Sequence, residues 1–227
     1  DEQKKTYLHA RMMQKSELAA YCLTEPAAGS DVIGIQTTAR RDGEHYVLNG
    51  TKQFITNGSY ADFHVVFAYT DKAAKHKGMS AFIVDRAFPG VTPGKKEDKM
   101  GQRASDTAAV IYEDVKVPRK NLLGKEGDGF PIAMQVFDRS RPAIGSMAVG
   151  VARRAMEESI AYAKQRQAFG KPIHTQQAVA FMIAEMAMNI EAARLLCWNS
   201  ARATERGNRA AKYAAFAKAF AADMCMK

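Results

Sequence analysis

The pattern of apolar and polar positions divides the chain into a strand-rich first half and a helical second half. From Ala19 to Pro118 the apolar residues form short runs that Gly, Asn, Asp and Pro interrupt, which is typical of strands joined by tight turns. From residue 129 onward, apolar residues recur three and four positions apart over long stretches, which predicts helices. We therefore expect an α+β fold in which an antiparallel β-barrel or sandwich is followed by an antiparallel α-helical bundle.

Short apolar or alternating segments give the expected strands, and Gly-containing dipeptides give the turns between them. Asp42-Gly43, Asn49-Gly50 and Asn57-Gly58 can each supply the positive φ angles of a hairpin turn. The expected strands are at 20–24, 45–48, 51–56, 62–70, 80–84 and 108–117.

Helical periodicity appears on both sides of the strand region. Residues 2–15 are rich in charge and have Tyr7, Leu8 and Met12 at helical spacing, so they predict a short amphipathic helix. A proline in the first helix of the second half, Pro142, is expected to kink that helix or to remove one of its hydrogen bonds. The helices of the second half are expected after the Gly-rich joint 124–129, at 129–166, 175–205 and 208–227.

The middle helix of these three has recognisable ends and one apolar face. Thr175 is a candidate N-cap and Gly207 a candidate C-cap. Residues three and four apart form a methionine-rich stripe, which we interpret as helical core: Phe181, Met182, Glu185, Met186 and Asn189. The predicted domains are the end of a helical region at 1–18, a strand domain at 19–126 and a helical domain at 127–227.

The composition is that of an ordinary globular protein, with 47% hydrophobic and 25% charged residues. No uninterrupted apolar run reaches the roughly 18 residues that a membrane span needs. The net charge of +9 is compatible with a nucleic acid, a membrane surface or a polyanionic cofactor. Because Lys and Arg are scattered without aromatic interleaving, we favour solvated helix faces and expect no nucleic-acid partner.

The three cysteines lack C-x-x-C spacing, which indicates reduced thiols and no metal site.

Two short segments suggest chemistry. The first, YCLTEPAAGSD at 21–31, begins as a strand and breaks into a loop of small residues, whose backbone amides suit anionic oxygens such as phosphate. Hydroxyls stand near both ends of this loop, on Thr24 and Ser30. In the second segment, KQFITNG at 52–58, Phe54 and Thr56 are two residues apart and share one face of a strand, where they offer an aromatic plane and a hydroxyl.

Together these two segments resemble the flavin-binding signatures of the acyl-CoA dehydrogenase family, with Phe54 where the family has tryptophan. The similarity covers essentially the whole chain in the family's order, and it is greatest to the medium-chain, mitochondrial-type members. It implies that the chain lacks the family's N-terminal helical domain and C-terminal end. The further matching segments are KMGQR at 99–103, EDVKVP at 113–118, FDRSRP at 137–142, RQAFGK at 166–171 and AEMA at 184–187.

The resemblance implies FAD as the cofactor and the strand domain as its binding domain. Thr56 would hydrogen-bond the flavin N5, Phe54 would pack on the ring face away from the substrate, and Thr24 would bond the pyrimidine edge. The other matching residues of this half are Tyr21, Leu23, Gly29, Ser30 and Ile55, with the Gly29-Ser30 turn at the pyrophosphate.

A second group of residues matches family positions that hold the adenosine-diphosphate half of FAD in a neighbouring subunit. They are Arg166, Gln167, Ala168, Phe169, Gln176 and Gln177, with Ala168 where many relatives have threonine. The resemblance therefore implies that cofactor binding requires a dimer, and that the intact protein is a homotetramer built as a dimer of dimers.

The implied reaction is α,β-dehydrogenation of medium-chain acyl-CoA thioesters in fatty-acid β-oxidation, with electrons passed to an electron-transfer flavoprotein. Phe137, Asp138 and Arg141 lie on about one helical turn. On their own they predict a surface ion pair that contributes a few tenths of a kcal/mol, and in the family they line the coenzyme A tunnel. Ser30 is also expected to contact the substrate. The location implied is the mitochondrial matrix in a eukaryote and the cytoplasm in a bacterium.

The catalytic base is not found in this sequence. The family's usual glutamate is expected beyond Lys227, and the alternative position corresponds to Ser140, which cannot act as that base. The carboxylates of Glu157, Glu158 and Glu185 are interpreted as structural. A related flavoprotein with other chemistry, such as an acyl-CoA oxidase or a flavin monooxygenase, and a non-catalytic assembly domain therefore stay open as alternatives.

Overall fold

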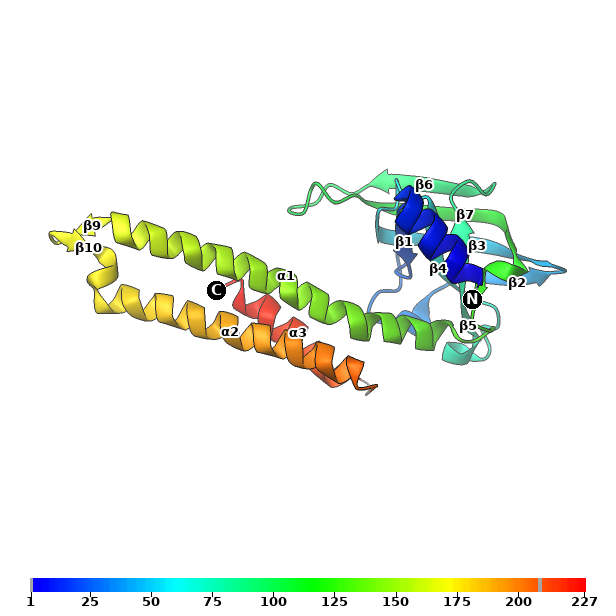
Figure 1. Ribbon diagram of the computed structural model, residues 1–227. Helices are drawn as coiled ribbons and strands as arrows, with labels where there is room; N and C mark the ends of the chain where they lie inside the picture. The colour runs from blue at the N-terminus through cyan, green and yellow to red at the C-terminus, as the bar shows by residue number, and fades with distance from the viewer. Residues whose placement is uncertain (1, 208–209) are drawn as a thin grey trace. The chain divides into compact units, whose positions relative to one another are not determined.

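Residues 2–207 and 210–227 are described from a computed structural model (Figure 1). The chain forms two compact units, Asp1–Ile132 and Ala133–Lys227, and each is described by itself. Two parts of the sequence-based prediction lie outside the described residues, namely Asp1 in the N-terminal helical region and 208–209 in the last helix.

The first unit is built on a sheet of eight strands in the order β6-β7-β3-β2-β4-β5-β8, with β1 beside β4. Neighbouring strands are antiparallel, except that β1 and β2 each run parallel to β4. The described strands therefore form an open sheet that ends at β6 and β8 and does not close into a barrel. The strands are β1 (Ala19–Cys22), β2 (Thr38–Asp42), β3 (His45–Thr56), β4 (Phe63–Tyr69), β5 (Met79–Asp85), β6 (Val91–Lys96), β7 (Thr107–Pro118) and β8 (Leu122–Leu123).

The core of this unit lies against the central strands. β4 and β5 are buried along nearly their whole length, and their near-continuous apolar sequences are typical of strands covered on both faces. Along much of β3 and β7 buried residues alternate with more exposed ones, so one face packs inward. The inward residues of these two strands include Tyr46, Leu48, Ile55, Val110, Tyr112, Val115 and Val117.

Short helical segments complete the unit. The predicted N-terminal helix is confirmed as η1 (Lys4–Gln14), which winds as a π-helix. Its Tyr7 ring lies 5.2 Å from that of Phe63, and Nη1 of Arg11 donates a hydrogen bond to Asp85 at 2.9 Å, so the helix packs on the sheet. Single 3₁₀ turns stand in the loops at η2 (Val32–Gly34), η3 (Lys75–Gly78) and η4 (Arg119–Asn121).

The three predicted hairpin dipeptides have three different outcomes. The Asp42-Gly43 prediction is confirmed, because Gly43 has φ +58° and the turn joins the paired residues Asp42 of β2 and His45 of β3. The Asn49-Gly50 prediction is wrong, because both residues lie inside β3, at a register shift in which the extra residue belongs to the partner strand β7. Asn57-Gly58 turns the chain after β3, but β3 pairs with β2 and β7, so it is no hairpin.

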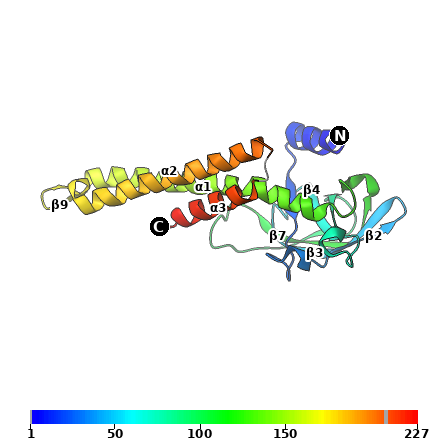
Figure 2. The same ribbon diagram turned by 90° about the horizontal axis from the view of Figure 1, so that it is seen from below.

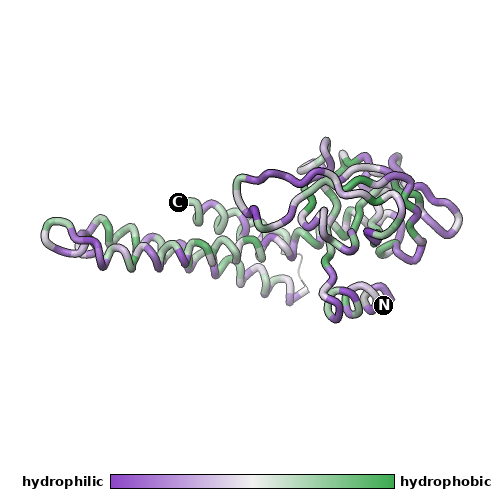
Figure 3. Tube along the Cα trace, turned by 90° about the horizontal axis from the view of Figure 1, so that it is seen from above, coloured by the Kyte–Doolittle hydropathy of each residue, from purple (hydrophilic) through white to green (hydrophobic). Residues whose placement is uncertain are grey.

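The helical unit contains most of α1 (Gly129–Gln165), α2 (Gln177–Glu205) and α3 (Ala211–Met224). α1 and α2 run antiparallel and are joined at one end by the small strands β9 (Gln167–Ala168) and β10 (Lys171–Pro172) and the turn η5 (Ile173–Thr175) (Figures 1 and 2). Polar and apolar stretches alternate along α1 and α2, as amphipathic helices require (Figure 3). The α+β class is confirmed by this unit and the sheet. No helix in the described part of the chain is long and apolar enough to cross a membrane.

Small residues let the helices of this unit approach closely. The buried cluster consists of Ala148, Val149, Ala152, Ile190, Ala193 and Ala221. α1 continues through Pro142 to Gln165, so the proline does not end it. The prediction that Thr175 caps α2 is wrong, since its hydroxyl donates to the Pro172 carbonyl and Gln176 occupies the cap position. Gly207 follows the last turn with φ +73°, as predicted for a helix C-terminus.

A buried histidine makes the stability of the sheet unit depend on pH. His64 on β4 is 1% exposed, and its Nδ1 lies 3.0 Å from the Tyr112 hydroxyl. Its Nε2 has no hydrogen-bond partner among the described residues. Burial, with a smaller contribution from Arg86, lowers the pKa of His64 from 6.5 to about 4.

We predict that acid destabilises the fold through His64. Between pH 6.5 and about 4 the unfolded chain binds a proton on this imidazole and the folded chain does not, so the free energy of unfolding should fall by up to about 3 kcal/mol across this window. Urea unfolding at several pH values measures the effect. His64→Asn should lose this component, whereas His45→Asn, at an exposed position of β3, should keep it. The same pH dependence in wild type and His64→Asn would contradict the assignment.

Candidate functional site

The structure brings the two motif segments together. The chain that follows β1 lies against β3, and the backbone N–H of Gln53 donates to the carbonyl of Thr24 at 2.9 Å. Thr24 is half-buried, and the next residue along β3 is Phe54. The aromatic ring and the hydroxyl that the sequence singled out in separate segments therefore belong to one local site.

A buried ion pair connects the same segments. The Lys52 side chain is 0% exposed, and its Nζ donates to Oε1 of Glu25 at 2.8 Å and to the carbonyl of Leu23 at 3.1 Å. The Glu25 carboxylate also accepts hydrogen bonds from the backbone N–H groups of Gln36 and Thr37 and from the Thr37 hydroxyl. Burial raises the pKa of Glu25, but Lys52 and these hydrogen bonds outweigh it and hold that pKa below its usual value. Burial likewise lowers the pKa of Lys52 against the attraction of Glu25.

Phe54 and Thr56 lie on the outer side of β3. Ile55 between them is 2% exposed, whereas Phe54 is 62% exposed and Thr56 is also exposed. The pairing of β3 with β7 shifts register between Lys52 and Ile55, and Phe54 has φ +56°. A left-handed backbone is uncommon for an aromatic residue and marks a place where local strain suggests function. The site thus presents a solvent-facing ring beside a hydroxyl.

The turn after Thr56 is held against β7. The backbone N–H of Asn57 (φ +61°) donates to the Asp106 carbonyl at 3.1 Å, and the carboxylate of Asp106 accepts from the Ser59 N–H at 2.9 Å. A Cβ on Gly58 would lie 2.9 Å from the carbonyl oxygens of Ala108 and Ile55, so only glycine fits without movement. Asn-Gly in this motif is therefore explained by packing.

The rest of the first segment forms an exposed loop. Gly29 and Ser30 are exposed, and a Cβ on Gly29 would meet no atom within 4 Å, so the backbone there is open to an approaching group. The side chains of Leu23 and Ile55 are buried, so these two residues can offer a ligand only their backbone groups. Tyr21 is half-buried and packs edge-on against Phe67, with ring centroids 5.0 Å apart.

In the helical unit, Phe137, Asp138 and Arg141 form one cluster on α1. Nη1 of Arg141 lies 3.6 Å from the Asp138 carboxylate, and its guanidinium carbon lies 5.5 Å from the centre of the Phe137 ring. All three side chains are partly exposed. The arrangement is the i,i+3 ion pair that the spacing predicts, with an aromatic neighbour. Ser140 is exposed on the same helix.

The other predicted residues gather at the connection between α1 and α2. Phe169 (φ +53°) and Gly170 (φ +73°) form the tight turn between β9 and β10, and the Phe169 ring is 92% exposed. Arg166, Gln167 and Gln177 are exposed around this turn, while Ala168 and Gln176 are half-buried. This end of the unit offers an exposed ring, a guanidinium group and side-chain amides.

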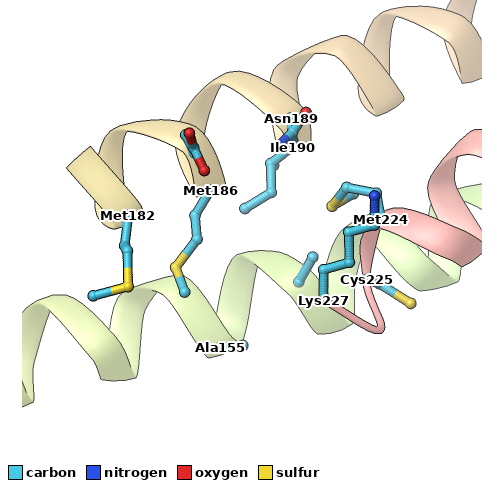
Figure 4. Close-up of a pocket in the computed structure, with 10 residues that line it drawn as sticks. Ala155, Met182, Met186, Asn189, Ile190, Met224, Cys225 and Lys227 are labelled. Carbon is cyan, nitrogen blue, oxygen red and sulfur yellow. The ribbon is translucent and has the colours of Figure 1, made fainter. Parts of the chain in front are cut away.

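Four residues of the methionine-rich stripe of α2, Met182, Glu185, Met186 and Asn189, line a pocket of about 240 Å³ (Figure 4). Phe181 is 59% and Met182 55% exposed, so the interpretation as helical core is wrong for these residues. The buried contacts of α2 begin near Ile190, where α3 packs, and the first half of α2 has no such cover among the described residues. The pocket is lined by Ala152, Ala155, Met182, Glu185, Met186, Asn189, Ile190, Met224, Cys225 and Lys227.

The three carboxylates that we interpreted as structural lie on the two long helices of the helical unit. Glu157 pairs with Arg153 at 2.8 Å and Glu158 pairs with Arg154, all on the exposed face of α1. Glu185 lies at the rim of the methionine-lined pocket. The described residues also contain no group of His, Cys, Asp and Glu side chains that could hold a metal ion.

Two protein-family models match the chain. The model of the acyl-CoA dehydrogenase middle domain matches residues 20–115, and the model of the acyl-CoA dehydrogenase C-terminal domain matches residues 127–227. A curated protein from Caenorhabditis briggsae, "Probable medium-chain specific acyl-CoA dehydrogenase 2, mitochondrial", is 46% identical over 212 residues, which cover 92% of this chain and 52% of that protein.

Solved structures show the same similarity. Butyryl-CoA dehydrogenase from Megasphaera elsdenii has a TM-score of 0.89 and 46% identity over 92% of this chain and 55% of its own. A structure described as an electron transferring flavoprotein of Acidaminococcus fermentans, in a study of flavin-based electron bifurcation, has a TM-score of 0.94 and 48% identity over 98% of this chain and 58% of its own. The chain spans a little over half the length of the proteins it matches.

We predict that the two glycines of the motif segments differ in their tolerance of a side chain. Gly58→Ala should lower the free energy of unfolding by about 2 kcal/mol, because its Cβ would press on two backbone carbonyls. Gly29→Ala is the matched control and should stay within about 0.5 kcal/mol of wild type. Urea unfolding of the cofactor-free protein tests both variants, and equal stabilities would contradict the packing explanation.

Proposed function

The chain belongs to the acyl-CoA dehydrogenase family, and from this premise we propose that it takes part in the FAD-dependent α,β-dehydrogenation of acyl-CoA thioesters. The observation that carries the proposal is the pairing of the two motif segments. The backbone hydrogen bond from Gln53 to Thr24 brings Thr24 next to the segment that exposes Phe54 and Thr56.

The residues at this site fit a flavin. A tricyclic ring needs a flat apolar surface and hydrogen-bond partners at its polar edge. The exposed Phe54 ring supplies the surface, and the hydroxyls of Thr56 and Thr24 supply the partners. We assign Thr56 to the flavin N5, Thr24 to the pyrimidine edge, and the open backbone at Gly29 and Ser30 to the pyrophosphate. When bound, FAD would accept the hydride that leaves the β carbon of the substrate.

We assign the α1–α2 connection to the adenosine-diphosphate half of FAD bound to a neighbouring copy of the chain. The exposed Phe169 ring can stack on a base, and the Arg166 guanidinium can pair with a phosphate. The amides of Gln167, Gln176 and Gln177 add hydrogen-bonding groups at the same end. On this assignment a homo-oligomer is required for complete cofactor binding.

We assign the Phe137–Asp138–Arg141 cluster and Ser30 to the coenzyme A portion of the substrate. Arg141 is held by its ion pair and by the Phe137 ring, so its guanidinium is already oriented for a phosphate or a carbonyl. The base that removes the α proton is assigned to no residue of this chain. A medium-chain acyl group is supported by the similarity to the Caenorhabditis briggsae protein, and an electron-transfer flavoprotein as acceptor is supported by the Acidaminococcus structure.

The reaction can be tested by flavin bleaching. We predict that the purified full-length protein is yellow and that octanoyl-CoA bleaches its flavin absorbance under anaerobic conditions, because the substrate reduces the ring. Slow recovery in air and fast recovery with an electron-transfer flavoprotein are expected. Rapid recovery in air would instead favour an acyl-CoA oxidase, and bound flavin without bleaching by any acyl-CoA would favour the assembly role.

The Thr56 assignment has a separate test. Thr56→Val should slow flavin reduction by about 10- to 100-fold, because a hydrogen bond to the ring atom on which charge develops is lost. Thr56→Ser keeps a hydroxyl and should retain most of the rate, and Thr38→Val at an exposed position of β2 is the control. Stopped-flow absorbance measures the rates. If Thr56→Val reduced its flavin as fast as wild type, the hydroxyl would have no role at N5.

A further inference from the structure

We propose that Lys52 and Glu25 are positioning residues for the cofactor, a buried pair that sets FAD affinity by fixing Thr24 relative to Phe54 and Thr56. The inference rests on the proposed function. Neither residue can touch the cofactor with its charged group, because their side chains are 0% and 5% exposed. They act on the cofactor site through the hydrogen bonds that they make to the backbone of neighbouring segments.

Lys52 and Gln53 hold three consecutive residues of the first segment. The Lys52 amine bonds the Leu23 carbonyl and the Glu25 carboxylate, which lie on either side of Thr24. The Thr24 carbonyl itself is bonded by the N–H of Gln53. Lys52 therefore holds the residues on either side of Thr24, and Gln53 holds the Thr24 backbone itself. Lys52 and Gln53 are the two residues that directly precede Phe54.

Glu25 extends this restraint in the other direction. Its carboxylate accepts from two backbone N–H groups and a hydroxyl at Gln36 and Thr37, and its backbone exchanges two hydrogen bonds with Ala28 at 2.9 and 3.1 Å. Ala28 directly precedes the Gly29-Ser30 turn, which we assign to the pyrophosphate. Glu25 thus connects the expected ring-binding end of the site, through its carboxylate, to the expected phosphate-binding loop, through its backbone.

The energetics favour a positioning role over a purely stabilising one. Burying two charges carries a large desolvation cost, and apolar residues of similar volume are often at least as stabilising. An ion pair whose hydrogen bonds have defined directions differs from an apolar contact in that it allows only one geometry. That geometry matters next to Phe54, whose left-handed backbone at a bulge must be held by its surroundings.

The experiment uses full-length protein stripped of flavin and refilled with FAD. The main variant is Lys52→Met combined with Glu25→Gln, which removes both charges and leaves no buried ion unpaired. Lys116→Met is the matched control, because Lys116 is an exposed lysine on the neighbouring strand β7. Three quantities are measured for each protein: the free energy of unfolding of the apoprotein, the dissociation constant for FAD, and the absorption spectrum of the bound flavin.

We expect the double variant to fold and to bind FAD at least tenfold more weakly, with a shifted flavin spectrum because Thr24 and Thr56 no longer meet the ring edge together. The control should match wild type in all three quantities. A folded double variant with wild-type FAD affinity and spectrum would overturn the inference. If the wild-type apoprotein itself took up no FAD, the proposed function would be contradicted. The inference, which rests on it, would then be contradicted too.

A milder substitution covers the case in which the double variant does not fold. Thr37→Val removes one hydrogen bond from the Glu25 carboxylate and unpairs no charge. It should weaken FAD binding about threefold or more, and Thr37→Ser, which keeps the hydroxyl, should restore the affinity. Wild-type affinity in Thr37→Val would count against a positioning role of Glu25.

Discussion

The Lys52 ammonium group, enclosed within the sheet unit, is the constraint on which the arrangement of both motif segments depends. A buried cation is tolerated only where acceptors surround it, and here they come from Leu23 and Glu25. Slipping the first segment along β3 by one residue would separate this cation from its carboxylate. The pair therefore selects one register between two segments that share no strand pairing in the described sheet.

The sheet fixes the position and the end of β3, which the ion pair does not determine. β3 is held on its other side by β7, through pairs on both sides of the bulge that exposes Phe54. The packing of Gly58 against the carbonyls of Ile55 and Ala108 then fixes where the strand ends. Because the bulge lies between two well-paired stretches, the unusual backbone of Phe54 is set by its neighbours and its ring is left on the surface.

The sequence predicted the features that local patterns determine. Asp42-Gly43 was correct because a two-residue turn between alternating strands is a local structure. Asn49-Gly50 failed because glycine is also needed inside a strand where another segment comes close, and a Cβ on Gly50 would clash with Thr37. The stripe around Met182 shows that periodicity identifies an apolar face and does not tell what covers it. The sequence also could not show whether the sheet is open or closed, because closure depends on pairing between strands that are distant in the chain.

The residues of the candidate site also fall into those that local patterns predict and those that they do not. Thr24, Phe54 and Thr56 could be found from the sequence because the motifs contain them, and the structure leaves their groups accessible. Lys52 and Glu25 are also in the motifs, but a lysine in a strand is expected at the surface, and its partner lies 27 residues earlier. Only the folded chain shows that they meet.

This division has a physical consequence for how substitutions act. An exposed hydroxyl such as that of Thr56 contributes little to folding, so its effect on a bound cofactor is separable from stability. At Lys52 the same contacts serve both the fold and the geometry of the site, so the two effects are coupled. Substitutions at Thr56 are then expected to act on cofactor binding and reduction alone, while those at Lys52 or Glu25 act on the fold and on the site together.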